Sequence, residues 1–267
     1  MSGLVYAIEG SEGIESERMF SVCSIVNNLN QYQEMLSSFR EHGFSESNSE
    51  FLYIDNSQTN KYDCFHGLNK LMKRCTGRYL ILCHQDIILL EDGASELVVC
   101  LEELNKTAPH WAVAGNAGVD ENHKKHIIIS DRHSKNRTEG SLPAIVSSLD
   151  ENFLILKRDA LLGFSRDLSG FHMYGTDICV QAALRGYSAH AINFHLHHLG
   201  LGSYSQAFFT CADEFEQKYS HAFKRRLIKT SCTKVLVGAT RLEIFFRYLK
   251  KIRKRKLRLR HAASKKK

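Results

Sequence analysis

The chain has 267 residues, of which 43% are hydrophobic and 24% charged, as in an ordinary globular protein. This composition excludes a wholly disordered chain, and the 2 Pro and 17 Gly residues exclude a collagen-like or low-complexity one. The charge is uneven, because residues 241–267 hold 13 of the 36 Lys and Arg residues but one of the 29 acids. That segment carries +12 and residues 1–240 carry −5, which predicts a mildly acidic body with a basic tail.

The N-terminal residues 1–18 are polar and rich in Glu, and we predict that they form a flexible arm. They lack the basic stretch followed by an apolar one that marks a secretory signal, so we expect a cytoplasmic protein. The sequence contains no run of about 18 apolar residues, which is the length that a membrane-spanning helix needs. The 8 cysteines show no CxxC spacing, which favours buried, reduced cysteines over a zinc site.

The first half of the chain alternates between two kinds of hydrophobic pattern. Short apolar runs predict strands, and apolar residues at helical spacing predict helices. The strands are predicted at 20–26, 51–54 and 79–83, and the helices around 32–39, 68–75 and 97–104. This alternation is typical of right-handed crossovers in a parallel sheet that has helices on both faces.

The second half mixes strands, polar loops and helices. Strands are predicted at 111–114, 126–129, 149–156 and 189–194, and a short helix at 176–184, with loops over 114–122 and 131–141. From Tyr204 the chain is predicted to be helical almost to its end. Since no repeat or linker is evident, we predict one domain over 19–222 and a basic amphipathic helical tail over 223–267.

Polar residues follow each of the first three predicted strands, where open α/β sheets bind ligands. Asp86, after the third strand, suits Mg²⁺ or Mn²⁺ bridging a diphosphate, although a carboxylate there can also cap a helix. Asp55, after the second strand, can accept hydrogen bonds from a base or ribose, but its position alone favours an Asx turn.

Two later segments also carry chemically useful side chains. Asp177 is either a general base or a carboxylate that complements a helix N-terminus beside Thr176. His195, His197 and His198 form an H-x-H-H cluster that could bind a metal or phosphates, although its spacing matches no closed zinc site.

The basic tail contains an apolar stripe flanked by cations. Leu242, Phe245, Leu249 and Ile252 recur at intervals of three and four residues. A basic amphipathic helix of this kind fits an anionic membrane surface. The alternatives are nucleic-acid binding and a helix within a homo-oligomer, and the stripe favours the membrane because phosphate binding does not need it.

Several segments together resemble the family 2 glycosyltransferases with the GT-A fold, in particular a small bacterial branch whose metal motif is HQD. The segments are FSVCSIVNN, FLYIDNSQTN, GLNKLMKRCTGRYLILCHQDI, LDENFLILKRDALLGF, SGFHMYGTDICVQAALRGYSAHAI and HLHHLGLGS. The resemblance runs from Phe20 to Ser203. It implies an α/β fold with a mixed, mainly parallel sheet. It also implies inverting transfer of a sugar from a nucleotide sugar to an acceptor. The basic tail indicates that this acceptor is a polysaccharide or a lipid-linked glycan at the inner face of the membrane.

The resemblance also implies roles for individual residues. Asp86 would bind a divalent metal, Mn²⁺ or Mg²⁺, with His198 or His197, and Asp177 would take the proton of the acceptor hydroxyl. The remaining residues would face the substrates: Ser24, Asn27, Asp55, Asn69 and His84 at the donor, and Asp150 and Glu151 under the sugar or acceptor.

Two positions depart from the common family pattern. His84 stands where that pattern has Asp, and Thr176 stands where it has Glu. These departures keep open an alternative, a catalytically weak or inactive GT-A scaffold that binds nucleotide or carbohydrate and docks on a membrane or complex. A nucleotidyltransferase is less favoured, because the segment SIVNNLNQ offers neither Gly nor Lys for a phosphate-binding loop.

Overall fold

The computed structural model describes residues 18–200, 205–238, 245, 248–250 and 252. The chain divides into two compact units, residues 1–213 and 214–267. This division lies nine residues before the predicted domain boundary at 222. The predicted N-terminal arm, apart from Arg18, and most of the predicted tail beyond residue 238 lie outside the described residues.

The first unit is built on a seven-stranded sheet in the order β2-β1-β3-β11-β5-β12-β9. Strands β2, β1, β3, β5 and β12 run in one direction, whereas β11 and β9 run in the opposite direction. The strands are β1 (Phe20–Val26), β2 (Ser49–Asp55), β3 (Tyr79–Cys83), β5 (Trp111–Gly115), β9 (Ala144–Val146), β11 (Phe153–Lys157) and β12 (Ser188–Ala191). The predicted mixed, mainly parallel sheet is therefore confirmed.

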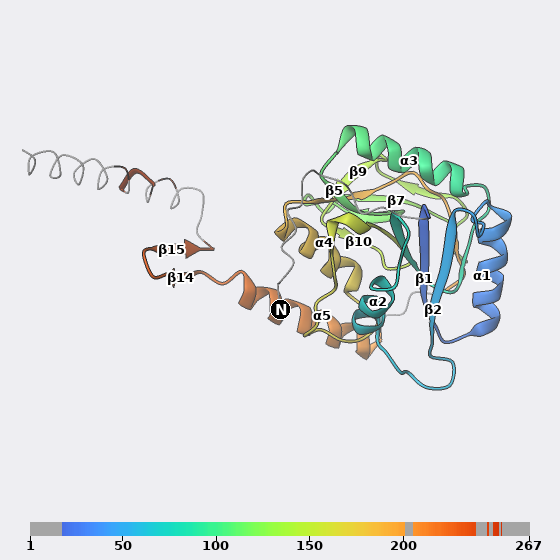
Figure 1. Ribbon diagram of the computed structural model, residues 1–267, viewed down its shortest axis with the longest axis horizontal. Helices are drawn as coiled ribbons and strands as arrows, with labels where there is room; N and C mark the ends of the chain where they lie inside the picture. The colour runs from blue at the N-terminus through green and yellow to red at the C-terminus, as the bar shows by residue number, and fades with distance from the viewer. Residues whose placement is uncertain (1–17, 201–204, 239–244, 246–247, 251, 253–267) are drawn as a thin grey trace, which may run out of the picture. The chain divides into compact units, whose positions relative to one another are not determined.

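Helices cover both faces of this sheet (Figure 1). They are α1 (Leu29–Glu41), α2 (Cys64–Met72), α3 (Ala94–Thr107) and α4 (Tyr174–Leu184), with a 3₁₀ turn at Arg158–Ala160. The apolar sides of α1 and α3, including Phe39 and Leu101, share one buried cluster with Val22 of β1. Helix α2 lies on the other face, where a Cβ on Gly67 would meet the neighbouring β1 side chain Ile25 at 2.6 Å.

The helices that follow β1 and β2 begin at side chains that cap them. Asn28 accepts hydrogen bonds from the backbone N–H groups of Asn30 and Gln31 at the start of α1. Asp63 does the same for the N–H of His66 in α2. Such caps satisfy N–H groups that the first turn of a helix leaves without a partner, so each strand is followed by a sharply defined loop.

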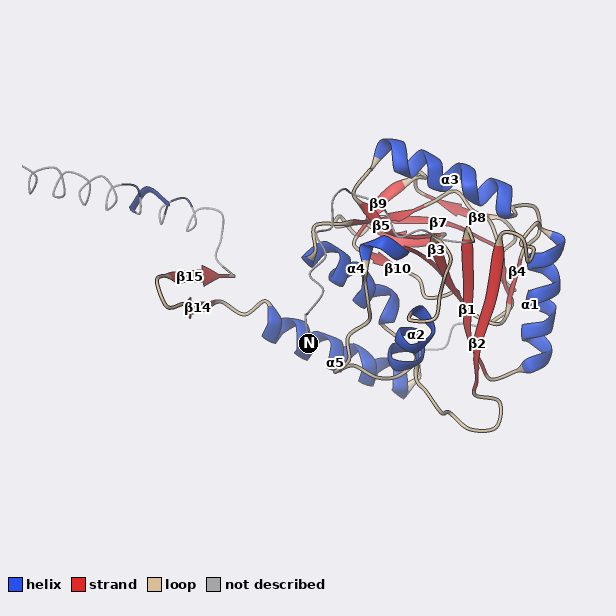
Figure 2. Cartoon of the chain, viewed as in Figure 1, coloured by secondary structure: helices blue, strands red, loops and turns tan. Residues whose placement is uncertain are grey.

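A second, four-stranded antiparallel sheet and a short ribbon complete the first unit (Figure 2). The sheet has the order β10-β6-β7-β8, and the ribbon pairs β13 with β4. These strands are β4 (Ile87–Ile88), β6 (Ala117–Val119), β7 (Lys125–Ile129), β8 (Arg137–Glu139), β10 (Ser148–Leu149) and β13 (His197–His198).

The small sheet corrects three details of the sequence analysis. Strands β6 and β8 lie in segments that were predicted to be loops. The strand predicted over 149–156 is interrupted at residues 150–152, because the Asp150 side chain accepts a hydrogen bond from the N–H of Asn152 and stabilises a turn. The chain therefore leaves one sheet as β10 and enters the other as β11.

The second unit contradicts the prediction of a continuous helix after Tyr204. Helix α5 (Gln206–Ala222) begins in the first unit and continues into the second, but β14 (Arg226–Lys229) and β15 (Lys234–Val237) form an antiparallel hairpin. The hairpin closes on a turn in which Thr230 Oγ1 accepts a hydrogen bond from the N–H of Thr233. Short runs with β-branched residues favour this ribbon over a helix. No helix among the described residues is long and apolar enough to cross a membrane.

Candidate functional site

A cavity of about 390 Å³ opens at the carboxyl ends of β1, β2 and β3. Each of these parallel strands contributes polar side chains from the residues that follow it: Asn27 after β1, Asn56 and Asn60 after β2, and His84, Gln85 and Asp86 after β3. Apolar side chains form the floor, among them Ile25, Leu68 and Leu82. A partly apolar cleft with a few convergent polar groups at this edge of an α/β sheet is the expected form of a ligand site.

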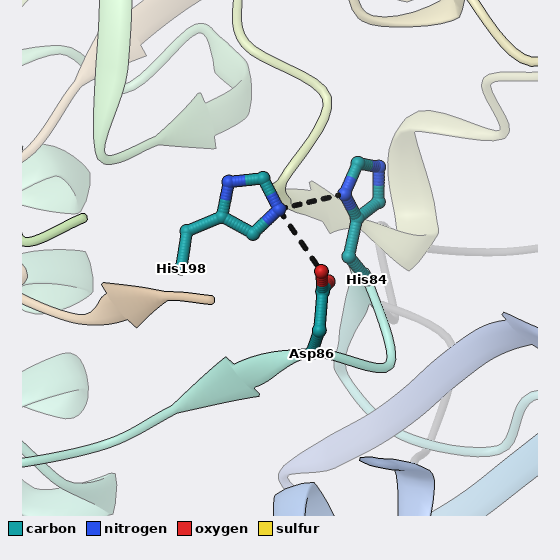
Figure 3. A group of neighbouring side chains, drawn as sticks. All are labelled: His84, Asp86 and His198. Atoms are coloured by element: carbon teal, nitrogen blue, oxygen red, sulfur yellow. Dashed lines mark hydrogen bonds and ion pairs between the residues drawn. The ribbon is translucent and has the colours of Figure 1, made fainter. Parts of the chain in front are cut away.

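His84, Asp86 and His198 form a tight cluster beside this cavity, and their side chains point toward one another (Figure 3). Nδ1 of His84 lies 3.3 Å from Nε2 of His198, which lies 3.4 Å from Oδ1 of Asp86. His198 and Asp86 are largely buried, with side chains 18% and 16% exposed. The cluster therefore presents two imidazole nitrogens and one carboxylate oxygen to one point.

The ribbon of β4 and β13 brings this cluster together from distant parts of the chain. His198 on β13 pairs with Ile87 of β4, one residue after Asp86. Two further backbone hydrogen bonds hold β13 in place. The N–H of Leu199 donates to the Asp86 carbonyl, and the N–H of His198 donates to the Ser130 carbonyl. His197 is the adjacent residue on the same strand and is not part of the cluster, since successive side chains of a strand point to opposite faces.

The surroundings of the cluster adjust the charge of each member. Although burial opposes both shifts, contact between His198 and Asp86 raises the pKa of His198 and lowers the pKa of Asp86. Burial, followed by the nearby His198, lowers the pKa of His84 and favours its neutral form. Nε2 of His84 is 2.9 Å from the Tyr174 hydroxyl, which orients the ring so that Nδ1 faces the cluster.

These three groups fit a divalent cation. Two ligand atoms that share one ion at about 2.1 Å lie roughly 3 Å apart, close to the separations in the cluster. The mixed nitrogen and oxygen donor set suits Mn²⁺ and other transition metals better than Mg²⁺, which prefers oxygen. Gly200 leaves room for such an ion, because a Cβ there would lie 2.6 Å from Asp86 Oδ2 and 2.9 Å from His198 Nε2.

Of the predicted donor residues, Asn27 and His84 line the cavity and three others do not. Ser24 is buried beneath α1, where its hydroxyl contacts the sulfur of Met35. Asp55 accepts a hydrogen bond from the N–H of Ser57, which is the Asx turn that its sequence also allowed.

Asn69 instead joins two segments of the first unit. Its side chain donates to the carbonyl of Phe164 and accepts from the N–H of the same residue. This pair of bonds holds α2 against the segment that precedes α4. The prediction that Asn69 contacts a donor has no support in this geometry, because its amide is already engaged with the backbone.

Asp177, the predicted base, is fully buried on α4 and does not line the cavity. Oδ2 accepts a hydrogen bond of 2.8 Å from the N–H of Ser165, and Oδ1 accepts one of 2.6 Å from its hydroxyl. A carboxylate satisfied in this way holds α4 against the preceding segment. The geometry favours a structural role for Asp177 and does not support its assignment as a base.

The two acidic residues predicted under the acceptor differ from one another. Asp150 is exposed and closes the turn to Asn152. Glu151 is more buried, with a side chain 19% exposed, and its Oε2 lies 4.0 Å from Nδ1 of the cavity residue His172. Burial, together with the charge of Asp150, raises the pKa of Glu151 to about 8.

Sequence reasoning missed several residues that line the cavity. Gln85, Asn60, His172 and Tyr174 were not predicted as site residues, although Gln85 lies between two residues that were. Met173, between His172 and Tyr174, has a left-handed backbone with φ of 67°. A residue of this type rarely adopts that conformation, so the turn that directs His172 and Tyr174 toward the cavity has no clear sequence signal.

Comparison with known proteins identifies one close relative by sequence. The chain is 39% identical over 230 residues to a protein of Fuscovulum blasticum called ATP synthase subunits region ORF 6, covering 84% of this chain and 92% of the relative. The name of that relative states no activity. No model of a known protein family matches the chain.

Solved structures with a similar fold include a glycosyltransferase. The mannosyltransferase PcManGT of Pyrobaculum calidifontis, solved with GDP-Man and Mn²⁺, aligns with a TM-score of 0.50 and 12% identity over 82% of this chain. The chain spans 66% of that protein. Residues 1–349 of TarS of S. aureus, solved with UDP-GlcNAc, align with a TM-score of 0.48 and 12% identity, over 69% of this chain and 59% of that fragment. At this identity the likeness to PcManGT shows the fold alone, which is of the GT-A type.

Proposed function

The chain belongs to the family of the protein called ATP synthase subunits region ORF 6 in Fuscovulum blasticum, and we propose that it is a glycosyltransferase that uses a nucleotide-sugar donor. The observation that carries this proposal is the cluster of His84, Asp86 and His198 at the mouth of the cavity. It lies at the edge of the sheet where open α/β folds bind nucleotides. We place the chain with the family 2 enzymes whose metal motif is HQD.

The cluster would hold Mn²⁺, and the charge of the ion would stabilise the diphosphate as it leaves the sugar. His84 and His198 would coordinate through the nitrogens that face each other, and Asp86 through a carboxylate oxygen. The amide side chains of Asn27 and Asn60 would border the nucleoside part of the donor, whereas the Asn56 amide is already bonded to the backbone of Lys61 and Tyr62. Amides can both donate and accept, as recognition of a base or ribose requires.

We assign the general base to Glu151. Inverting transfer needs a carboxylate near the acceptor hydroxyl, and Glu151 lies next to the cavity residue His172. Its raised pKa, about 8, matches the demand for a base that exchanges protons near neutral pH. Asp177 is less suited to this role because it is fully buried and bonded to Ser165, whereas the Glu151 side chain is 19% exposed.

The acceptor would be a growing polysaccharide or a lipid-linked glycan at the inner face of the cell membrane. The support for this part is the excess of cations in residues 241–267, which would attract an anionic surface. A protein held at the membrane would meet a lipid-linked acceptor at high local concentration.

A catalytically inactive scaffold is the second candidate function. Two observations favour it: the cluster contains a single carboxylate, and the predicted base, Asp177, is buried away from the cavity. Such a scaffold would bind nucleotide or carbohydrate at the same cavity without releasing product. A measurement of donor turnover distinguishes an active glycosyltransferase from an inactive scaffold.

The test is release of nucleoside diphosphate from a panel of UDP and GDP sugars, with MnCl₂ or with EDTA. We expect Mn²⁺-dependent release from one donor, and a loss of about 10²-fold or more in Asp86→Asn, which removes a charged ligand. Glu34→Gln, an exposed site on α1, is the matched control and should retain full rate. Binding of a nucleotide without any release would support the scaffold, and release that EDTA does not affect would exclude the metal role.

A further inference from the structure

We propose that Gln85 is a positioning residue that couples the metal cluster to the nucleotide-binding wall of the cavity. Its side chain holds the loop between β1 and α1 against the loop that carries His84 and Asp86. A nucleoside diphosphate that must reach both loops then binds tightly only while this connection is intact. The inference rests on the proposed function and adds a residue whose role is distinct from metal ligation.

Gln85 uses both ends of its amide in this connection. Oε1 accepts hydrogen bonds from the backbone N–H groups of Asn27, at 2.8 Å, and Asn28, at 2.9 Å. Nε2 donates to Asn27 Oδ1, at 2.5 Å, and to Gln31 Oε1, at 3.2 Å. One side chain therefore makes four hydrogen bonds, all of them to residues between the end of β1 and the first turn of α1.

The partners of Gln85 include groups that need an acceptor. The N–H groups around a helix N-terminus have no partner within the helix. Asn28 caps α1 with its side chain, but its own N–H is bound by Gln85. Removing the Gln85 amide would leave the N–H groups of Asn27 and Asn28 to water and would free the loop to move.

The two loops that Gln85 joins carry different parts of the site. Asn27 lines the cavity from the loop after β1, and His84 and Asp86 line it from the loop after β3. A donor that contacts an ion on Asp86 and the wall at Asn27 requires a fixed distance between them. Gln85 sets that distance, since it lies between the two ligands in sequence and bonds to Asn27 in space.

The metal cluster has separate anchors that do not involve the Gln85 side chain. The N–H of His84 donates to the Asn152 carbonyl, and the N–H of Leu199 donates to the Asp86 carbonyl. Loss of the Gln85 amide should therefore affect nucleotide binding far more than binding of the ion alone. A residue that merely supported the fold would weaken both together.

Two substitutions separate the hydrogen bonds from the bulk of the side chain. Gln85→Met keeps the length and volume but removes all four hydrogen bonds. Gln85→Glu keeps the two acceptor bonds to the backbone, and the amides of Asn27 and Gln31 can turn to donate to the second carboxylate oxygen. A carboxylate is also favourable at a helix N-terminus. Gln33→Met, exposed on α1, is the matched control.

The experiment is isothermal titration of MnCl₂ alone, and then of UDP and GDP into the Mn²⁺-saturated full chain. We expect Gln85→Met to weaken binding of the nucleotide that the wild type prefers by about 10-fold or more, with Mn²⁺ affinity within about threefold of wild type. Gln85→Glu should recover most of the nucleotide affinity, and Gln33→Met should match the wild type.

Three results would overturn this role for Gln85 while leaving the proposed function standing. These are wild-type nucleotide affinity in Gln85→Met, an equal loss of Mn²⁺ and nucleotide affinity in that variant, or no recovery in Gln85→Glu. Failure of the wild-type chain to bind UDP, GDP or, in the same titration, ADP or CDP would instead overturn the proposed function, and the role of Gln85 with it.

Discussion

At Glu151, burial raises the pKa of the carboxyl group from 4.5 to about 8, and the neighbouring Asp150 adds to the shift. The folded protein therefore holds this proton more tightly than the unfolded chain does. The resulting contribution to stability is fully present below pH 4.5 and is lost as the pH rises toward about 8. Each pH unit in this window weakens folding by up to about 1.4 kcal/mol.

Glu151→Gln removes this titration, so its stability should fall less between pH 5 and pH 8 than that of the wild type. The difference in Tm between the two proteins, followed by circular dichroism across this range, should grow as the pH rises. In the same window kcat/KM of the wild type should increase, because the base must lose its proton. A constant Tm difference would show that Glu151 has an ordinary pKa.

Asp177→Asn tests the structural role of the buried carboxylate. An amide nitrogen in place of one oxygen would face a donor of Ser165, which costs about 1–3 kcal/mol when a buried group loses its partner. We expect a Tm lower by several degrees and unchanged nucleotide affinity. Ser165→Ala removes the hydroxyl bond to Asp177 and also the bond that this hydroxyl accepts from Gln181, so it should lower Tm as well. Wild-type Tm together with abolished turnover would restore Asp177 as the base.

At the scale of elements, Gly200 provides the space in which β13 and the loop after β3 bring the metal ligands together. A Cβ at this position would crowd Asp86 Oδ2 and His198 Nε2 at 2.6 and 2.9 Å, so at least one ligand must move. Gly200→Ala should therefore weaken Mn²⁺ binding by about 10-fold or more, with little change in Tm.

The matched control for Gly200→Ala is Gly163→Ala, where a Cβ would approach only the side chain of Asn69, at 3.1 Å. Binding can be followed by the loss of the free Mn²⁺ signal in electron paramagnetic resonance. Equal Mn²⁺ affinity in both variants would show that the ion does not occupy the space beside Gly200.

The central strands could be predicted from the sequence because each is a continuous apolar run. The predicted bounds of β1 and β3 agree with the structure, and β5 differs by one residue. The short strands β6 and β8 could not be predicted, because three residues are too few to show the alternation of apolar and polar side chains that marks a strand. The hairpin over 226–237 was mistaken for helix, although Val235, Val237 and the Thr-rich turn offered a signal for strands.

The candidate site was only partly predictable, for reasons of side-chain direction. Polar residues after parallel strands meet at one edge, which is why Asn27, His84 and Asp86 come together as expected. Because successive side chains of a strand point to opposite faces, Ser24 points into the core with Val22 and Val26 and does not line the cavity. Pairing of β4 with β13, which selects His198 over His197, depends on contacts distant in sequence.

At the scale of the whole molecule, the chain combines an α/β unit with a basic C-terminal segment. Three of the four residues of the predicted amphipathic stripe lie in the described part of the chain: Phe245 and Leu249 are exposed, and Ile252 is partly buried. The hairpin adds cations of its own at Arg226, Lys229 and Lys234. Membrane attachment stays a prediction that rests on this charge and on the exposed apolar side chains.

Removal of residues 241–267 should abolish binding to vesicles that contain anionic lipid, because it deletes 13 cations and a single acid. Activity on a soluble acceptor should be unchanged. Binding is measured by co-sedimentation with vesicles of phosphatidylglycerol and phosphatidylcholine, at low and high salt, since attraction between exposed charges is screened. Unaltered binding by the shortened chain would contradict the role of this segment and direct attention to the hairpin.

Binding of a nucleoside diphosphate in the cavity, through a metal on His84, Asp86 and His198, is the core of the proposed function. Its most direct test is a thermal shift of the full chain with UDP, GDP, ADP and CDP, each with and without Mn²⁺. A ligand at 100 times its Kd stabilises a protein by about 2.7 kcal/mol, which is readily seen. We predict a rise in Tm with one nucleotide that requires Mn²⁺ and is lost in Asp86→Ala. No shift with any nucleotide, or an equal shift in Asp86→Ala, would contradict the account.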